Sequence, residues 1–131
     1  MRTPRRFPVR LIRLLLLGAL CGCSSPTAPG SDVLSVEVVS PALSLKNLVN
    51  VPVYTFIADP NYLALVDWTP CTDPAQCPSI APGEKRSIPY TAITGYTPTT
   101  LEAIVYHWLL VPKSGGGFQP DGIRAIRVTL R

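Results

Sequence analysis

Apolar and polar residues alternate with a period of two from residue 33 onward, which is the spacing of β-strands with one buried face. In the first run, residues 33–39, Val36 and Val38 alternate with Ser35 and Glu37, and the run ends before Pro41. The same pattern, bounded by turn-forming residues, predicts further short strands over residues 43–46, 53–57, 63–68 and 84–90. We therefore expect an all-β protein.

The longest apolar segment, residues 101–111, carries apolar side chains at both alternating sets of positions. One set includes Tyr106 and Trp108, and the other includes Val105 and His107. A helix is the alternative, but the aromatic and β-branched residues and the proline that follows favour a strand. Apolar residues on both faces predict a central strand that is covered on each side. Residues 126–130 predict a closing strand with one apolar face, joined to the central strand through a glycine-rich turn at residues 114–117.

About seven short strands in roughly 100 residues are typical of a single immunoglobulin-like β-sandwich, which we place at residues 33–131. Two stretches resemble the β-sandwich domains of exported bacterial proteins: residues 43–47 followed by 51–53, and residues 80–84 leading into a strand. Fibronectin-type and proteinase-inhibitor-type sandwiches share such signatures. The resemblance supports the fold and implies no particular function.

Residues 1–22 have the layout of a cleaved secretory signal, with arginines first, an apolar stretch at residues 11–20, and then small residues. The last four positions, Leu20-Cys21-Gly22-Cys23, resemble a bacterial lipobox, although Cys21 stands where alanine or serine is commoner. The resemblance implies cleavage before Cys23 and a lipid on its sulfur, which would anchor the chain to membrane lipid. A plain secretory signal or an uncleaved anchor is the alternative.

Residues 23–32 would then form the lipidated cysteine and a flexible tether, because they combine serine, proline and glycine without apolar periodicity. Ser24, rather than aspartate, follows the cysteine. In bacteria that sort lipoproteins, this implies the outer membrane, facing the periplasm. We therefore expect a membrane-anchored lipoprotein of the bacterial cell envelope.

The positive charge of the chain belongs to this targeting segment. The full sequence has 12 basic and 8 acidic residues, but five of the arginines precede residue 14. Cleavage before Cys23 leaves seven basic residues against eight acidic ones. A nearly neutral domain lacks the basic patch of a nucleic-acid-binding protein, so we expect no nucleic-acid partner.

Cys71 and Cys77 are the remaining cysteines, with five residues between them, one of which is a proline. In an oxidising compartment this pair predicts a disulfide that closes a short loop and stabilises the fold by roughly 2 kcal/mol. A redox pair or a metal site is the alternative. Redox pairs favour two intervening residues, and a metal would need further ligands.

The candidates for catalysis and metal binding are few. His107 is the only histidine, and we expect it on the outer face of its strand, hydrogen-bonded or solvated. A blue-copper site needs two histidines and a cysteine, so we expect no metal and no cofactor. The acidic residues Asp59, Asp67, Asp73 and Glu102 are scattered, mostly in turns, and we interpret them as turn and surface residues. The sequence therefore predicts that the domain is not an enzyme.

Aromatic residues are numerous for so small a domain, and we single out Trp68, Tyr96 and Trp108 as candidate binding residues. Most aromatic residues of this kind lie in a core, and Tyr96 stands where immunoglobulin-like folds have a corner tyrosine. If two or three of them share a surface, they would form a platform for protein or glycan.

We expect a non-catalytic protein-interaction or structural module, whose partner is an envelope protein. The alternatives are a carbohydrate- or peptidoglycan-binding module that uses surface aromatics, and an inhibitor-type sandwich.

Overall fold

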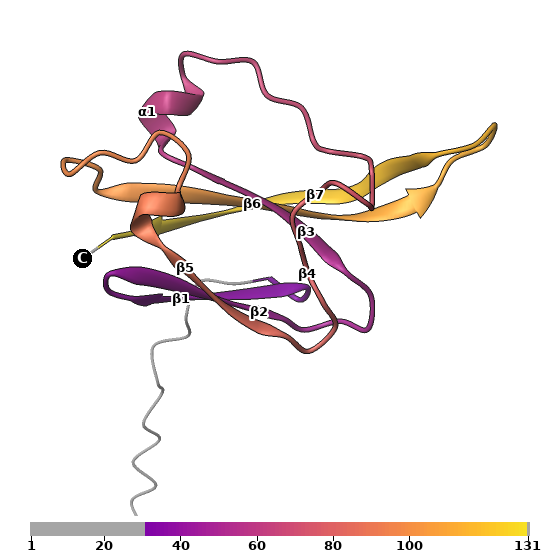
Figure 1. Ribbon diagram of the computed structural model, residues 1–131, viewed down its shortest axis with the longest axis horizontal. Helices are drawn as coiled ribbons and strands as arrows, with labels where there is room; N and C mark the ends of the chain where they lie inside the picture. Colours follow the sequence, from indigo (N-terminus) through magenta and orange to yellow (C-terminus); the bar gives the residue numbers. More distant parts are fainter. Residues whose placement is uncertain (1–30, 131) are drawn as a thin grey trace, which may run out of the picture.

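In the computed structural model, which describes residues 31–130, the chain folds into two packed antiparallel sheets (Figure 1). The first sheet has the order β1-β2-β5, formed by Leu34–Val39, Ala42–Asn47 and Lys85–Pro89. The second has the order β4-β3-β6-β7, formed by Ser79–Ile80, Val53–Ala58, Glu102–Pro112 and Phe118–Thr129. A short helix α1 (Pro60–Leu63) and a 3-10 turn η1 (Tyr90–Ala92) lie in the connections. The expectation of a small all-β sandwich is confirmed.

The strands are divided between the sheets as in immunoglobulin-like folds, with the first, second and fifth in one and the third, sixth and seventh in the other. The fourth strand pairs with β3 here, whereas constant-type immunoglobulin domains place it beside the fifth strand. The central strand β6 lies between β3 and β7.

The core between the sheets follows directly from the alternation of the sequence. Every second residue of the paired strands points inward, so opposite residues such as Val36 and Leu45 are buried together. The buried apolar side chains from both sheets form one cluster, which includes Leu34, Val36, Leu43, Leu45, Val53, Ile57, Ala103, Val105, Ile126 and Val128. Full burial of a side chain of this size contributes about 1.5–3 kcal/mol, and this burial holds the two sheets together.

Asn47 is a buried polar residue at the end of β2. Its Nδ2 donates hydrogen bonds to the carbonyl oxygens of Val51 and Ile80, at 2.8 and 2.9 Å. Its Oδ1 accepts one from the amide of Val49 at 2.8 Å. Asn47 therefore fixes the β2–β3 connection and joins it to β4.

Residues 63–68 do not form the expected strand. Asp59 caps a helical turn that begins at Pro60, and the Asp59 carboxylate accepts a hydrogen bond from the amide of Asn61 at 2.6 Å. An acidic cap followed by proline at the first helical position favours a helix start over the turn that we had expected. The chain then crosses the outer face of the second sheet without regular structure until the two-residue strand β4, which the sequence pattern did not predict.

The β6–β7 hairpin extends well beyond the rest of the sandwich (Figure 1). β7 begins at Phe118, earlier than expected, and Pro112 pairs with Phe118 across the turn. The register shifts opposite Trp108, where Gly122 adopts a φ of +61°. This bulge marks the point beyond which the two strands continue as a projecting arm, residues 109–121, which we call the hairpin arm.

Candidate functional site

Cys23, the candidate lipidation site, lies outside the described residues. Within residues 31–130, no helix is long and apolar enough to cross a membrane.

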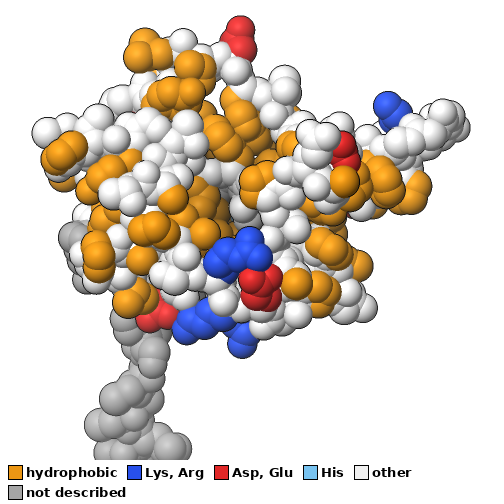
Figure 2. All heavy atoms as spheres, in the orientation of Figure 1, with side chains coloured by type: hydrophobic (Ala, Val, Ile, Leu, Met, Phe, Trp, Pro, Cys, Tyr) orange, Lys and Arg blue, Asp and Glu red, His pale blue; other side chains and the backbone are white. Residues whose placement is uncertain are grey.

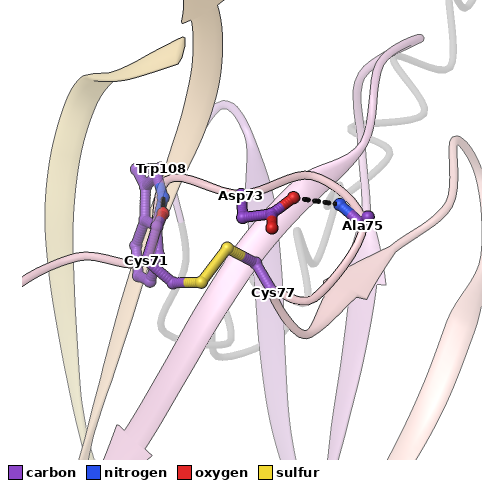
Figure 3. The surroundings of a disulfide bond; sticks show 5 residues. All are labelled: Cys71, Asp73, Ala75, Cys77 and Trp108. Atoms are coloured by element: carbon purple, nitrogen blue, oxygen red, sulfur yellow. Dashed lines mark hydrogen bonds between the residues drawn. A yellow bond between two sulfur atoms is a disulfide. The ribbon is translucent and has the colours of Figure 1, made fainter. Parts of the chain in front are cut away.

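Cys71 and Cys77 form the expected disulfide, with an S–S distance of 2.01 Å and their Cα atoms 5.7 Å apart (Figure 3). Asp73 organises the loop between them. Its carbonyl oxygen accepts a hydrogen bond from the amide of Cys77 at 2.9 Å, and its carboxylate accepts one from the amide of Ala75 at 2.9 Å. The pair therefore constrains the irregular segment that crosses the second sheet, which is a structural role.

Trp68 lies in this irregular segment and packs on aromatic residues of the sheet beneath it. Its ring stacks on Phe56, with centroids 4.9 Å apart and planes inclined by 10°. The rings of Tyr106 and Trp108 lie 4.5 and 5.8 Å away. Trp108 is buried, and its indole N–H donates a hydrogen bond to the carbonyl oxygen of Cys71 at 3.1 Å (Figure 3). These residues form a second small core on the outer face of the second sheet.

Only two of the three candidate binding aromatics are brought together. Trp68 and Trp108 share the outer cluster, whereas Tyr96 packs against the main core, with its ring 6.2 Å from that of Tyr90. Trp68 and Tyr96 are both partly buried. The three side chains therefore form no common platform.

His107 is fully buried, so the expectation that it lies on an outer face is wrong. It points to the side of β6 that packs toward the first sheet, and its Nε2 lies 2.8 Å from Ser31 Oγ. Ser31 Oγ also accepts hydrogen bonds from the amides of Val33 and Leu34, at 3.2 and 3.1 Å. Ser31 therefore ties the beginning of β1 to the middle of β6.

The surroundings of His107 favour its neutral form. Burial lowers the pKa of His107, and the positive charge of Arg124 lowers it further, although the carbonyl oxygen of Val105 acts in the opposite direction. His107 Nδ1 faces the carbonyl oxygen of Val105, which favours the ring proton on Nδ1, so the Ser31 hydroxyl donates to Nε2 at 2.8 Å. The carbonyl oxygen of Leu34 is a more distant acceptor for the same hydroxyl, at 3.4 Å. A buried histidine with a lowered pKa is a poor general base at neutral pH, so the Ser31–His107 pair resembles a structural contact more than a catalytic one.

Asp59 is buried rather than exposed, contrary to its interpretation as a surface turn residue. The hydroxyl of Thr100 donates a hydrogen bond to its Oδ2 at 2.5 Å, while the amide of Asn61 donates to its Oδ1. The Thr100 hydrogen bond is the largest cause of a lowered pKa for Asp59, because it stabilises the carboxylate against the cost of burial. Asp59 directly before Pro60, which we interpreted as a turn, is the sequence signal of a helix cap.

Two shallow hollows lie at the end of the sandwich that carries α1 and the beginning of β6, which we call the distal end. The larger, about 470 Å³, is lined mostly by polar residues: Asp59, Asn61, Thr99, Glu102, Arg127 and Thr129, together with Pro60 and Leu101. Arg127 and Glu102 form an ion pair there at 2.7 Å. The smaller hollow, about 350 Å³, contains Tyr96 and shares Leu101, whose side chain is 73% exposed.

No group of three or more His, Cys, Asp or Glu side chains within residues 31–130 is placed to hold a metal ion. Comparisons of the chain with protein-family models, with curated proteins and with solved structures gave no match.

Proposed function

We propose that this protein is a lipid-anchored module of the bacterial cell envelope that binds another envelope protein without catalysing a reaction. The lipobox-like ending at Cys23 supports the anchor. The Cys71–Cys77 disulfide supports the compartment, because such bonds persist in the periplasm and outside the cell but are rare in the cytosol. We also propose that the anchor lies in the outer membrane and that the domain faces the periplasm.

The non-catalytic role is supported by His107 and Asp59, the two side chains best suited to acid–base chemistry, because both are engaged in contacts within the fold. His107 is buried with a lowered pKa and contacts Ser31, and Asp59 is held by Thr100 and the amide of Asn61. Both side chains stabilise the fold, which makes them poor candidates for reacting with a substrate.

We place the partner-binding surface at the distal end. Ser31, just before β1, lies beside the middle of β6, and β1 runs from there away from the hairpin arm. It ends near Pro41, whose carbonyl oxygen accepts a hydrogen bond from the amide of Tyr90 at the distal end. A chain anchored through residues before Ser31 would therefore hold the two hollows away from its attachment point.

The anchor is tested by labelling cells with radioactive palmitate. Cys23→Ala should abolish labelling, whereas the control Cys21→Ala should retain it, because Cys21 precedes the expected cut. Labelling of the Cys23→Ala chain would remove the lipoprotein assignment.

The partner is tested by a photo-cross-linking residue at Thr99, with one at Ser87 on the exposed face of β5 as a control, in the native envelope. Capture of one dominant protein from Thr99 alone would support the interaction module. The alternative, a glycan-binding module, rests on the partly exposed ring of Trp68. Retention of the chain on purified peptidoglycan that is lost in Trp68→Ala would favour that alternative instead.

A further inference from the structure

We infer that the hairpin arm rests on the surface of the membrane that holds the lipidated Cys23. This inference depends on the proposed anchor and adds a second contact with the same lipid surface. It follows from where the arm points, how far it reaches, and which side chains it exposes.

The described part of the chain begins close to the base of the arm. Ser31, the first described residue, contacts His107 in the middle of β6. From His107, β6 continues five residues to Pro112, and the turn at residues 113–117 follows. At about 3.3 Å per residue, the strands extend roughly 17 Å beyond the level of Ser31. The first sheet does not accompany them, as Figure 1 shows.

The chain between Cys23 and Ser31 is long enough for the end of the arm to reach the membrane. Eight residue steps separate Cys23 from Ser31. A fully extended chain of that length spans at most about 29 Å. The lipid on Cys23 would therefore hold Ser31 within about 29 Å of the membrane surface, and the end of the arm lies well inside that distance. When the arm points toward the membrane, the turn at residues 113–117 reaches the membrane before any other part of the second sheet.

The outer face of the arm is apolar. Directly paired residues point to the same face of a sheet, so Leu110 lies beside Pro120 and Pro112 beside Phe118. Phe118 is 40% exposed, and Pro112 is exposed as well. Figure 2 shows hydrophobic side chains along the projecting arm and a basic side chain near its end.

The positive charge at the end of the arm and the backbone of the arm favour lipid over a protein strand, since Asp121, the one acidic residue of the arm, lies at its base. Lys113, at the beginning of the turn, would lie among headgroups, and anionic lipids attract such a charge. Pro120 has no N–H, and the bulge at Gly122 breaks the regularity of the β7 edge. An edge interrupted in this way is a poor template for the addition of a strand from a partner.

The experiment uses the full mature protein, lipidated in a bacterial host and reconstituted in vesicles of phosphatidylethanolamine and phosphatidylglycerol. A fluorescent probe is attached through Ser114→Cys in the turn, or through Thr91→Cys at the distal end as a matched control. Spin-labelled lipids in the bilayer should quench the probe at position 114 several-fold more than the probe at position 91.

A second pair of variants tests the apolar face. Phe118→Ser should reduce quenching at position 114 to the level at position 91, because it removes the largest exposed apolar side chain of the arm. Val39→Ser changes an apolar residue with 52% exposure on another strand and should leave the quenching unchanged.

The outcomes separate the two proposals. The mass of the N-terminal peptide shows whether Cys23 carries lipid; if it does not, both the anchor and the membrane contact are wrong. If Cys23 is lipidated but the two probes are quenched equally, the anchor stands and the hairpin contact is overturned. Capture of a protein by a photo-cross-linker at position 114 in the envelope, without quenching by lipid, would also overturn the contact with lipid.

Discussion

Replacing Ser31 with alanine should weaken the attachment of β1 to β6. The Ser31 hydroxyl contacts His107 Nε2 at 2.8 Å and accepts hydrogen bonds from the amides of Val33 and Leu34. Each such hydrogen bond contributes about 1 kcal/mol net. Val33 is partly exposed, so water can replace the hydroxyl at its amide, whereas Leu34 is buried. We therefore expect a loss of about 2 kcal/mol in the free energy of unfolding, rather than 3.

The burial of His107 predicts a dependence of stability on pH. The pKa of His107 is lower in the folded protein than in the unfolded chain, where it is near 6.5. As the pH falls through about 6.5, the unfolded chain therefore binds protons that the folded protein does not yet bind. Stability is retained above this pH and falls below it, by at most about 1.4 kcal/mol per pH unit, until the folded pKa is reached.

The measurement is urea unfolding followed by tryptophan fluorescence at about pH 7.5, 6.5 and 5.5. It needs a chain without a histidine tag, because His107 is the only histidine of the sequence. His107→Gln should remove most of the pH dependence in this range, and Ser87→Ala, at an exposed position on β5, is the control for Ser31→Ala. An unchanged slope in His107→Gln, or a wild-type stability independent of pH, would refute the reasoning.

Three further substitutions test the connections of the fold. Replacing Cys71 and Cys77 together with alanine should lower the free energy of unfolding by about 2 kcal/mol, measured by urea unfolding without reductant, because the ring closes over a sequence separation of 6. Asn47→Ala should cost about 3 kcal/mol in the same assay, since it removes three hydrogen bonds; a loss below 1 kcal/mol would contradict this role. Gly95→Ala should lower the thermal midpoint by several degrees, because Gly95 has a φ of +77° and an added methyl group would collide with the Tyr62 side chain. An unchanged midpoint would contradict that placement.

The regular strands were predictable because a single physical rule sets their pattern. In β1 and β2, one face meets the core and the other meets water, so Leu34, Val36, Leu43 and Leu45 alternate with polar residues. β6 was also predictable, because apolar residues in both alternating sets of positions require cover on both faces. The main core covers one face, and the cluster around Trp68 covers part of the other.

The errors about the burial of His107 and Asp59 arose because the decisive partner of each is far away in the sequence. His107 and Ser31 are 76 residues apart, and Asp59 and Thr100 are 41 apart. From the local sequence alone, we expect a polar side chain to face water, because burying it without a hydrogen-bond partner costs free energy. Only the folded structure supplies the partners that remove this cost.

The crossing between α1 and β4 shows how a segment without regular structure can be held in place. Residues 64–78 have few backbone hydrogen bonds of their own, so other contacts must offset the entropy of ordering them. Three contacts do so: the stacking of Trp68, the hydrogen bond from Trp108 to Cys71, and the disulfide. The aromatic residues that looked most suited to binding thus have a structural task, because they fasten this segment to the sheet. A partner that displaced these aromatic rings from the sheet would expose the outer cluster. We therefore propose that the partner binds at the distal end.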